Sequence, residues 1–221
     1  MKVKIFIWAV LYNAAYIVGQ YSRCAYLTEL LVVIYTALFI AWLFRTGQNI
    51  SAGITLKNIK RDKLWVTVPL FMLMVYNLCT SGGYTPALSS VVLMFCVAVT
   101  EEVFFRGVLP QFFWKKSLLR AIVLSNILFS MYHLTNISGE TIVNYVVLQM
   151  LLSFAVGLCY SFTAAIHKST VPCIIAHFFT NITGNAVYTV KGTEVIWLVF
   201  LAAIYLLYSI YLFKSNKSLF T

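Results

Sequence analysis

Two adjacent carboxylates, Glu101 and Glu102, directly follow an apolar run that extends from Leu88 to Val99. An ionised carboxylate taken out of water costs several kcal/mol, and an acidic residue at the centre of a membrane helix costs about 2.5–3.5 kcal/mol. Such a pair inside an apolar segment therefore indicates a functional site. Arg106 lies four residues after Glu102, so on a helix its guanidinium can reach back to a carboxylate.

Two further polar pairs lie in later apolar segments. Phe129 is four residues before His133, and His177 is four residues before Asn181. A spacing of four places both members of each pair on one helix face. Three separate segments of the chain therefore each contribute polar groups that can converge inside a membrane.

Together these residue types form a hydrolytic set. A carboxylate can take a proton from water, and two histidines can bind the same water or a metal that lowers its pKa. The Asn181 amide can donate to an oxyanion, and Arg106 can hold a glutamate ionised and oriented. We therefore interpret Glu101, Glu102, His133, His177 and Asn181 as candidate catalytic residues, with Arg106 and Phe129 in support.

The composition predicts an all-α polytopic membrane protein. The 221 residues are 62% apolar and only 10% charged, against roughly 45–50% and 25% in soluble domains, and the mean hydropathy is +0.89. No polar block is long enough for a soluble domain. We expect one membrane-embedded domain over residues 1–221, with the motif-bearing core at about 87–190.

About eight transmembrane helices are expected from the apolar runs. The first, preceded by Lys2 and Lys4, lacks a clean cleavage site, so we interpret it as a retained span rather than a signal peptide. The expected spans are about 5–18, 26–44, 64–78, 87–114, 118–133, 142–166, 171–190 and 195–213. The fourth contains the two glutamates.

The net charge of +10 is explained by the loops and not by nucleic-acid binding, because no basic stretch interleaved with aromatic residues lies outside them. With eight spans, 13 of the 16 Lys and Arg residues fall on the side of both termini and two fall on the other side. This bias predicts cytoplasmic termini in a cell membrane. His167, beside Lys168, is expected at the cytoplasmic surface and outside the site.

The three motifs in this order resemble the CPBP family of CAAX proteases and bacteriocin-processing enzymes, also called Abi proteins. The match consists of Glu-Glu-x-x-x-Arg at 101–106, Phe-x-x-x-His at 129–133 and His-x-x-x-Asn at 177–181. The resemblance implies an eight-helix intramembrane endopeptidase whose site opens toward the cytoplasmic side.

The family also implies roles for the matched residues. Glu101 would be the base that activates water, and His133 and His177 would bind the water or a metal. Asn181 would stabilise the oxyanion, and Glu102 and Arg106 would support the site. With Glu101, the two histidines would provide three ligands for Zn²⁺ or another divalent metal, with one position open.

Three functions remain open at this point. The first is a bacterial membrane peptidase that acts on peptide precursors or membrane-associated substrates, in bacteriocin or signal-peptide maturation or in self-immunity. The second is a non-catalytic immunity or scaffold protein with the same fold. The third is a small-ion carrier that uses Glu101 and Glu102 as ligands, although the chain shows no repeat symmetry of the kind that many transporters have.

Overall fold

The all-α prediction is confirmed. The computed structural model describes residues 2–22, 24, 26–80, 85–113, 117–136, 143–184 and 192–220, and every regular element within these ranges is a helix. The elements are α1 (Lys2–Tyr21), α2 (Leu27–Arg45), η1 (Arg61–Phe71), α3 (Met72–Thr80), α4 (Leu88–Glu102), η2 (Val103–Val108), α5 (Pro110–Phe113), α6 (Leu118–Tyr132), η3 (His133–Asn136), α7 (Val143–His167), α8 (Val171–Gly184), α9 (Gly192–Ser215) and α10 (Lys217–Phe220).

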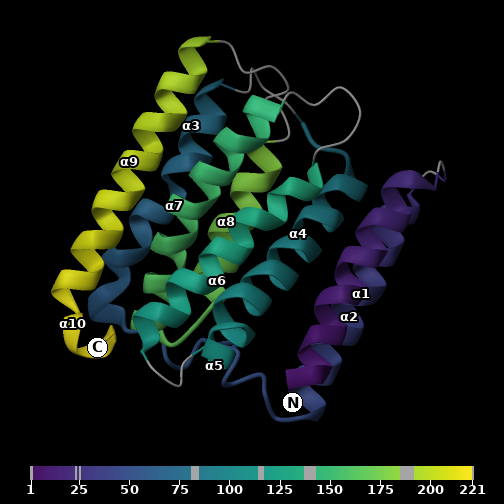
Figure 1. The fold of residues 1–221 in the computed structure, drawn as a ribbon, viewed down its shortest axis with the longest axis horizontal. Coiled ribbons are helices and arrows are strands. Elements are labelled where there is room, and N and C mark those ends of the chain that lie inside the picture. Colours follow the sequence, from purple (N-terminus) through teal and green to yellow (C-terminus); the bar gives the residue numbers. More distant parts are fainter. Residues whose placement is uncertain are drawn as a thin grey trace.

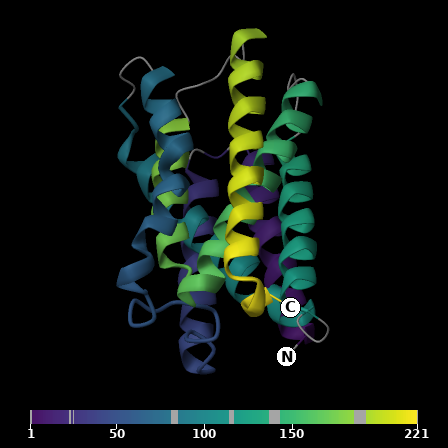
Figure 2. The same ribbon diagram turned by 90° about the vertical axis from the view of Figure 1, so that its left-hand side faces the viewer.

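The helices alternate in direction along one bundle (Figures 1 and 2). The N-terminus and the C-terminus lie at the same end, which we call the termini end; α5 and α10 also lie there (Figure 1). The other end, where α1 and α8 finish and α7 and α9 begin, is called the far end. Both termini therefore lie at one end of the bundle, as expected for a chain that crosses the membrane an even number of times.

The expected spans correspond to helices in the described ranges. Five are long and apolar enough to cross a membrane, and three are shorter apolar helices. The five are Leu27–Arg45, Arg61–Thr80, Leu88–Phe113, Val146–His167 and Val195–Ser215, and the shorter three are Phe6–Gly19, Leu118–Tyr132 and Val171–Gly184. The last part of the span expected at 171–190 lies outside the described residues, as do Arg23, Lys115, Lys116 and Lys191.

The fourth span is not the single regular α-helix that its apolar run predicts. Directly after Glu102 it becomes a π-helix, η2, in which the Leu109 N–H donates to the Phe104 carbonyl at 2.8 Å. Pro110 has no backbone N–H and cannot donate a hydrogen bond to a carbonyl in the preceding turn. A missing hydrogen bond of this kind is a known cause of irregular turns in α-helices. The Phe105 carbonyl instead accepts a hydrogen bond from the Ser125 hydroxyl on α6. Wider turns of this kind often occur at functional sites.

The expectation that His167 lies on the surface is wrong. Its side chain is completely buried, and its Nδ1 accepts a hydrogen bond from the Lys60 N–H at 3.2 Å. The reason is tertiary: the segment between α2 and η1 folds back over the end of α7. The expectation rested on the neighbouring Lys168, and a neighbouring charge cannot reveal a contact between residues 107 positions apart.

The same segment between α2 and η1, residues 46–60, covers the termini end of the bundle. The Thr170 N–H donates to the Gly53 carbonyl at 2.9 Å, and the Ser169 hydroxyl donates to the Thr55 carbonyl at 2.6 Å. Ala52 is fully buried, and a Cβ at Gly107 would overlap its carbonyl oxygen. We call residues 46–60 the floor segment because they pack beneath η2 and α8.

Replacement of Ser169 by alanine tests how the floor segment is attached. The Ser169 hydroxyl also accepts from the Val171 N–H at 3.3 Å, so Ser169→Ala removes a partner from two backbone groups at once. Each buried polar group left unpaired costs about 1–3 kcal/mol, and we expect the apparent Tm of the purified protein in detergent to fall by several degrees.

Ser51→Ala is the matched control, because Ser51 is exposed and its hydroxyl bonds only locally, to the Gln48 carbonyl. Its Tm should stay within about a degree of the parent, in keeping with surface substitutions elsewhere. Equal Tm values for the two variants would contradict the anchoring role of Ser169.

Candidate active site

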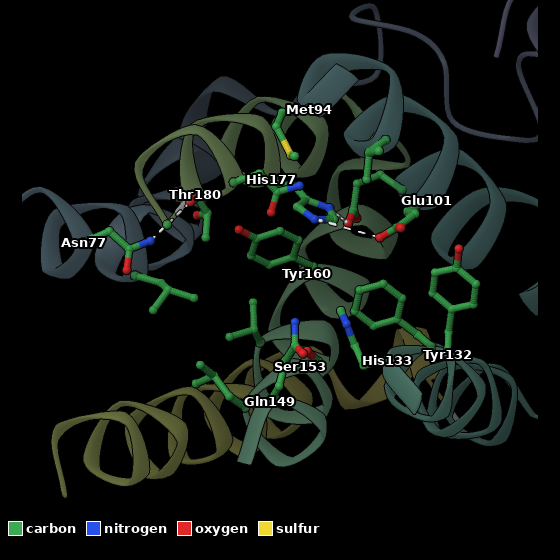
Figure 3. Close-up of a pocket in the computed structure, with 18 of the residues that line it drawn as sticks. Asn77, Met94, Glu101, Tyr132, His133, Gln149, Ser153, Tyr160, His177 and Thr180 are labelled. Atoms are coloured by element: carbon green, nitrogen blue, oxygen red, sulfur yellow. Dashed lines mark hydrogen bonds and ion pairs between the residues drawn. The ribbon is translucent and has the colours of Figure 1, made fainter. Parts of the chain in front are cut away.

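The predicted site residues line one cavity of about 360 Å³ inside the bundle. Figure 3 shows side chains from several helices facing this space. The predicted residues among its lining are Glu101, Glu102, Arg106, Phe129, His133, His177 and Asn181. The tertiary structure therefore brings all three motifs to one place, although they lie on α4 with η2, on α6 with η3, and on α8.

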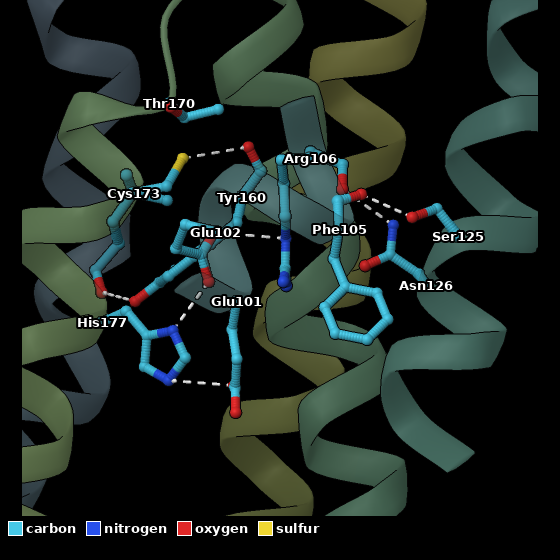
Figure 4. Close-up of polar contacts among 12 residues, drawn as sticks. Glu101, Glu102, Phe105, Arg106, Ser125, Asn126, Tyr160, Thr170, Cys173 and His177 are labelled. Carbon is cyan, nitrogen blue, oxygen red and sulfur yellow. Dashed lines mark hydrogen bonds and ion pairs between the residues drawn. The ribbon is translucent and has the colours of Figure 1, made fainter. Parts of the chain in front are cut away.

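His177 is positioned between the two glutamates (Figure 4). Its Nδ1 lies 2.7 Å from Glu102 Oε1, and its Nε2 lies 3.9 Å from Glu101 Oε2. A carboxylate is an acceptor, so the short contact places a proton on Nδ1 and directs Nε2 toward Glu101. Glu102 thus orients the imidazole, while Glu101 faces the remaining ring nitrogen across a gap.

Arg106 holds the other side of Glu102. Its Nε lies 3.2 Å from Glu102 Oε2, and Glu102 is completely buried. The guanidinium carbon also lies 4.0 Å from the centre of the Phe129 ring, which is a cation–π geometry. Phe129 therefore supports the site by stacking on Arg106, and the i,i+4 contact between Glu102 and Arg106 is confirmed.

Arg106 also depends on a small residue that the sequence does not single out. A Cβ at Gly157 on α7 would collide with the Asn126 side-chain oxygen and would lie 3.0 Å from Arg106 Nη2. Asn126 is itself fixed by a 2.8 Å hydrogen bond from its Nδ2 to the Ser161 hydroxyl. The close approach of α6 and α7 beside the guanidinium thus requires glycine at this position.

Tyr12 on α1 is a site residue that motif reasoning missed. Its buried hydroxyl donates to Glu101 Oε1 at 3.2 Å. It joins residues 89 positions apart, and a tyrosine in an apolar run carries no recognisable signal. Glu101 therefore has one oxygen bonded to Tyr12 and the other facing His177.

His133 and Asn181 complete the wall of the cavity. His133 follows the last residue of α6, and its ring centre lies 5.3 Å from that of Phe129. The centre of the His177 ring lies 6.4 Å from the centre of the same phenyl ring. Asn181 is one turn beyond His177 on α8 and lines the same space. Both residues border the space in front of Glu101 and His177.

The predicted metal ligands are only partly gathered. Glu101 Oε2 and His177 Nε2 face each other at 3.9 Å. The hydrogen bond from the other ring nitrogen of His177 to the Glu102 carboxylate is of a kind that metal-bound histidines commonly make. Among the described residues, however, no group of three or more His, Cys, Asp or Glu side chains is close enough to hold a metal. With His133 apart from the other two, zinc binding stays a prediction.

Residues 83–183 match the family model described as type II CAAX prenyl endopeptidase Rce1-like. This segment is similar to the proteins of that family. The match contains all three motifs and confirms the resemblance to CAAX-type membrane proteases. No curated protein gives a significant match to the chain. The Rce1-like segment includes α4, η2, α6, α7 and most of α8, whereas Tyr12 and the floor segment lie outside it.

Replacement of Arg106 tests the buried ion pair. Arg106→Ala leaves Glu102 buried without its cation, and breaking a buried pair in this way costs about 3–5 kcal/mol. We expect a large loss of monodisperse protein in detergent together with loss of activity. Arg120→Ala is the matched control, because Arg120 lies exposed on α6 and its loss should leave yield unchanged. Normal yield of Arg106→Ala would contradict the structural role of the pair.

Replacement of Tyr12 tests how Glu101 is oriented. Tyr12→Phe removes one hydrogen bond to a carboxylate, a contribution of about 1.5 kcal/mol or more, so kcat should fall about tenfold. The Tm should fall by only a few degrees, and the yield should stay near that of the parent. Tyr35→Phe is the control, since the Tyr35 hydroxyl donates to the Trp8 carbonyl and not to Glu101. If both variants retain full kcat, Tyr12 does not position Glu101.

Proposed function

We propose that this protein is an intramembrane endopeptidase in which Glu101 activates the attacking water. The observation that carries the proposal is the opposition of Glu101 Oε2 and His177 Nε2 across 3.9 Å, at the base of a cavity within a bundle of apolar helices. The Rce1-like match over residues 83–183 supports the same reaction class.

The gap between Glu101 and His177 has the size of a bridging water. A water about 2.8 Å from each atom, the usual hydrogen-bond length, fits between two atoms at this separation. It would donate one proton to Glu101 and the other to His177 Nε2, which accepts because Nδ1 carries the ring proton toward Glu102. Both of its protons are then engaged, and an oxygen lone pair is left to face the peptide carbonyl.

In the proposed reaction Glu101 removes a proton from the water as its oxygen bonds to the carbonyl carbon. The carbonyl oxygen becomes an oxyanion, which Asn181 and His133 would stabilise by hydrogen bonds from the cavity wall. When the C–N bond breaks, Glu101 returns its proton to the departing amine. The products are a carboxylic acid, which keeps the second water proton until it ionises on release to solvent, and an amine. Glu101 is again ionised for the next cycle.

Glu102 and Arg106 act through other groups in this proposal. Glu102 fixes the tautomer of His177, and Arg106 neutralises Glu102 so that two adjacent carboxylates can coexist in a buried site. A divalent metal held by Glu101 and His177, with His133 moved closer, would polarise the carbonyl and acidify the water. The chain's own groups provide the proton acceptor in either case.

The substrate class follows from the membrane setting. We infer that the protein cleaves peptide precursors or membrane-associated peptides in a bacterial cell membrane. Such a cleavage would serve the maturation of a bacteriocin or signalling peptide, or self-immunity against a bacteriocin. The whole chain, residues 1–221, would act as one domain, since Tyr12 of α1 contacts the site.

Replacement of Glu101 by glutamine is the central test. Glu101→Gln keeps the shape but cannot take up a proton, so cleavage of a fluorogenic peptide library by the full chain in detergent should fall by at least about 100-fold. Glu29→Gln is the matched control, because Glu29 lies on α2 and does not line the cavity. It should cleave at the parent rate.

A chelator applied to the parent protein distinguishes a metal-assisted mechanism from one in which Glu101 alone activates the water. Loss of cleavage that added Zn²⁺ restores would show a metallopeptidase, and full retention would favour water activated by Glu101 alone. If Glu101→Gln cleaves as fast as the parent, the catalytic role of Glu101 is wrong. A binding protein would keep its partner in Glu101→Gln and show no cleavage in any variant.

A further inference from the structure

We propose that an anionic phospholipid binds at the termini end of the bundle, where the start of η1 lies beside the last turns of α9. We call this surface the lipid seam; it consists of residues 61–68 of η1 and 207–214 of α9. None of these residues lines the catalytic cavity. The site is therefore separate from the reaction at Glu101 and does not depend on it.

The two helices of the lipid seam are joined by side-chain contacts. The ring centres of Trp65 and Tyr211 lie 6.0 Å apart. Closer to the termini end, the Lys63 ammonium donates to the Asn216 side-chain oxygen at 3.0 Å, across 153 positions of the chain. Figure 1 shows η1 and the end of α9 side by side, next to α10. The two segments therefore present one continuous surface.

The part of the lipid seam nearest the termini end is basic. Arg61 and Lys214 are exposed, and Lys63 is half-buried. Among the described residues, none of these three side chains forms an ion pair. Asp62 is the one acidic residue in the seam, so cations outnumber carboxylates by three to one. Since the protein does not neutralise this excess itself, the surface attracts an anion.

Two aromatic side chains follow the cations in the direction of the far end. Trp65 lies two residues after Lys63, about 4 Å along η1, and Tyr211 lies three residues before Lys214, about 4.5 Å along α9. The exposed fractions of Trp65 and Tyr211 are 49% and 48%. Tryptophan and tyrosine are enriched where lipid headgroups meet the hydrocarbon. The rings therefore match the depth of the glycerol esters of a lipid whose phosphate meets the cations.

Aliphatic side chains continue the lipid seam one turn further toward the far end. Val68 lies three residues after Trp65, which places both on one face of a 3₁₀-helix. Leu207 lies four residues before Tyr211, on the same face of α9. The exposed fractions of Val68 and Leu207 are 67% and 68%. Cations, aromatic rings and aliphatic side chains thus follow one another in the order of phosphate, glycerol ester and acyl chain in a phospholipid.

This order favours a phospholipid over a soluble anion and an anionic lipid over a zwitterionic one. A free phosphate would contact the cations but leave Val68 and Leu207 exposed. A zwitterionic headgroup has no net charge, so the excess of Lys and Arg would contribute little to its binding. Phosphatidylglycerol has the required negative charge, and the hydroxyls of its headgroup can donate to the Asp62 carboxylate.

A lipid bound at the seam would also hold the floor segment in place. The last residue of that segment, Lys60, donates its backbone N–H to His167 at the end of α7, and η1 begins at Arg61. A lipid that bridges η1 and α9 therefore restrains the connection between η1 and the floor segment. Because a ligand that binds only the folded state stabilises it, phosphatidylglycerol should raise the Tm of the purified chain.

Titration of phosphatidylglycerol into the delipidated full chain, followed by native mass spectrometry, tests this site. Arg61→Gln and Lys214→Gln each remove one exposed cation from the lipid seam. Arg45→Gln is the matched control, because Arg45 is also exposed and ends α2 at the termini end, on the opposite side of the bundle from η1 (Figure 1). Phosphatidylcholine and glycerol 3-phosphate, which lack the net charge and the acyl chains respectively, are the comparison ligands.

We expect Arg61→Gln and Lys214→Gln each to raise the apparent Kd for phosphatidylglycerol about fivefold, the effect of one basic residue near an anionic lipid. Arg45→Gln should stay within about twofold of the parent, and the parent should bind both comparison ligands more weakly. Equal weakening by all three substitutions would indicate general attraction to a basic surface and overturn the proposal. Equal affinity for phosphatidylcholine or for glycerol 3-phosphate would also overturn it. Binding is measured without cleavage, so it can be repeated in Glu101→Gln whatever the outcome for the peptidase.

Discussion

The site depends on one buried electrostatic arrangement, in which Glu102 is held between the Arg106 guanidinium and the His177 imidazole. A carboxylate in this position would be costly alone, and both of its oxygens are engaged, at 3.2 Å and 2.7 Å. Since Glu102 is satisfied in this way, it can fix the direction of His177. Glu101 is then the carboxylate that remains available for chemistry.

The backbone beside this arrangement departs from a regular α-helix. The π-helix η2 begins directly after Glu102, and Pro110 and Ser125 account for the hydrogen bonds that a regular helix would have made. Gly157 and Phe129 shape the surroundings of Arg106 from α7 and α6. Local irregularity and close helix packing together direct the charged groups into the cavity instead of toward lipid.

The sequence by itself determined the all-α membrane architecture, the approximate helices and the motif residues, because apolar periodicity and the cost of buried charge are local properties of the chain. It also predicted the contact between Glu102 and Arg106 from their four-residue spacing. Only the tertiary structure decided that Tyr12 bonds to Glu101 and that His167 is buried beneath the floor segment. Those features join residues about 90 or more positions apart, and no local pattern encodes such contacts.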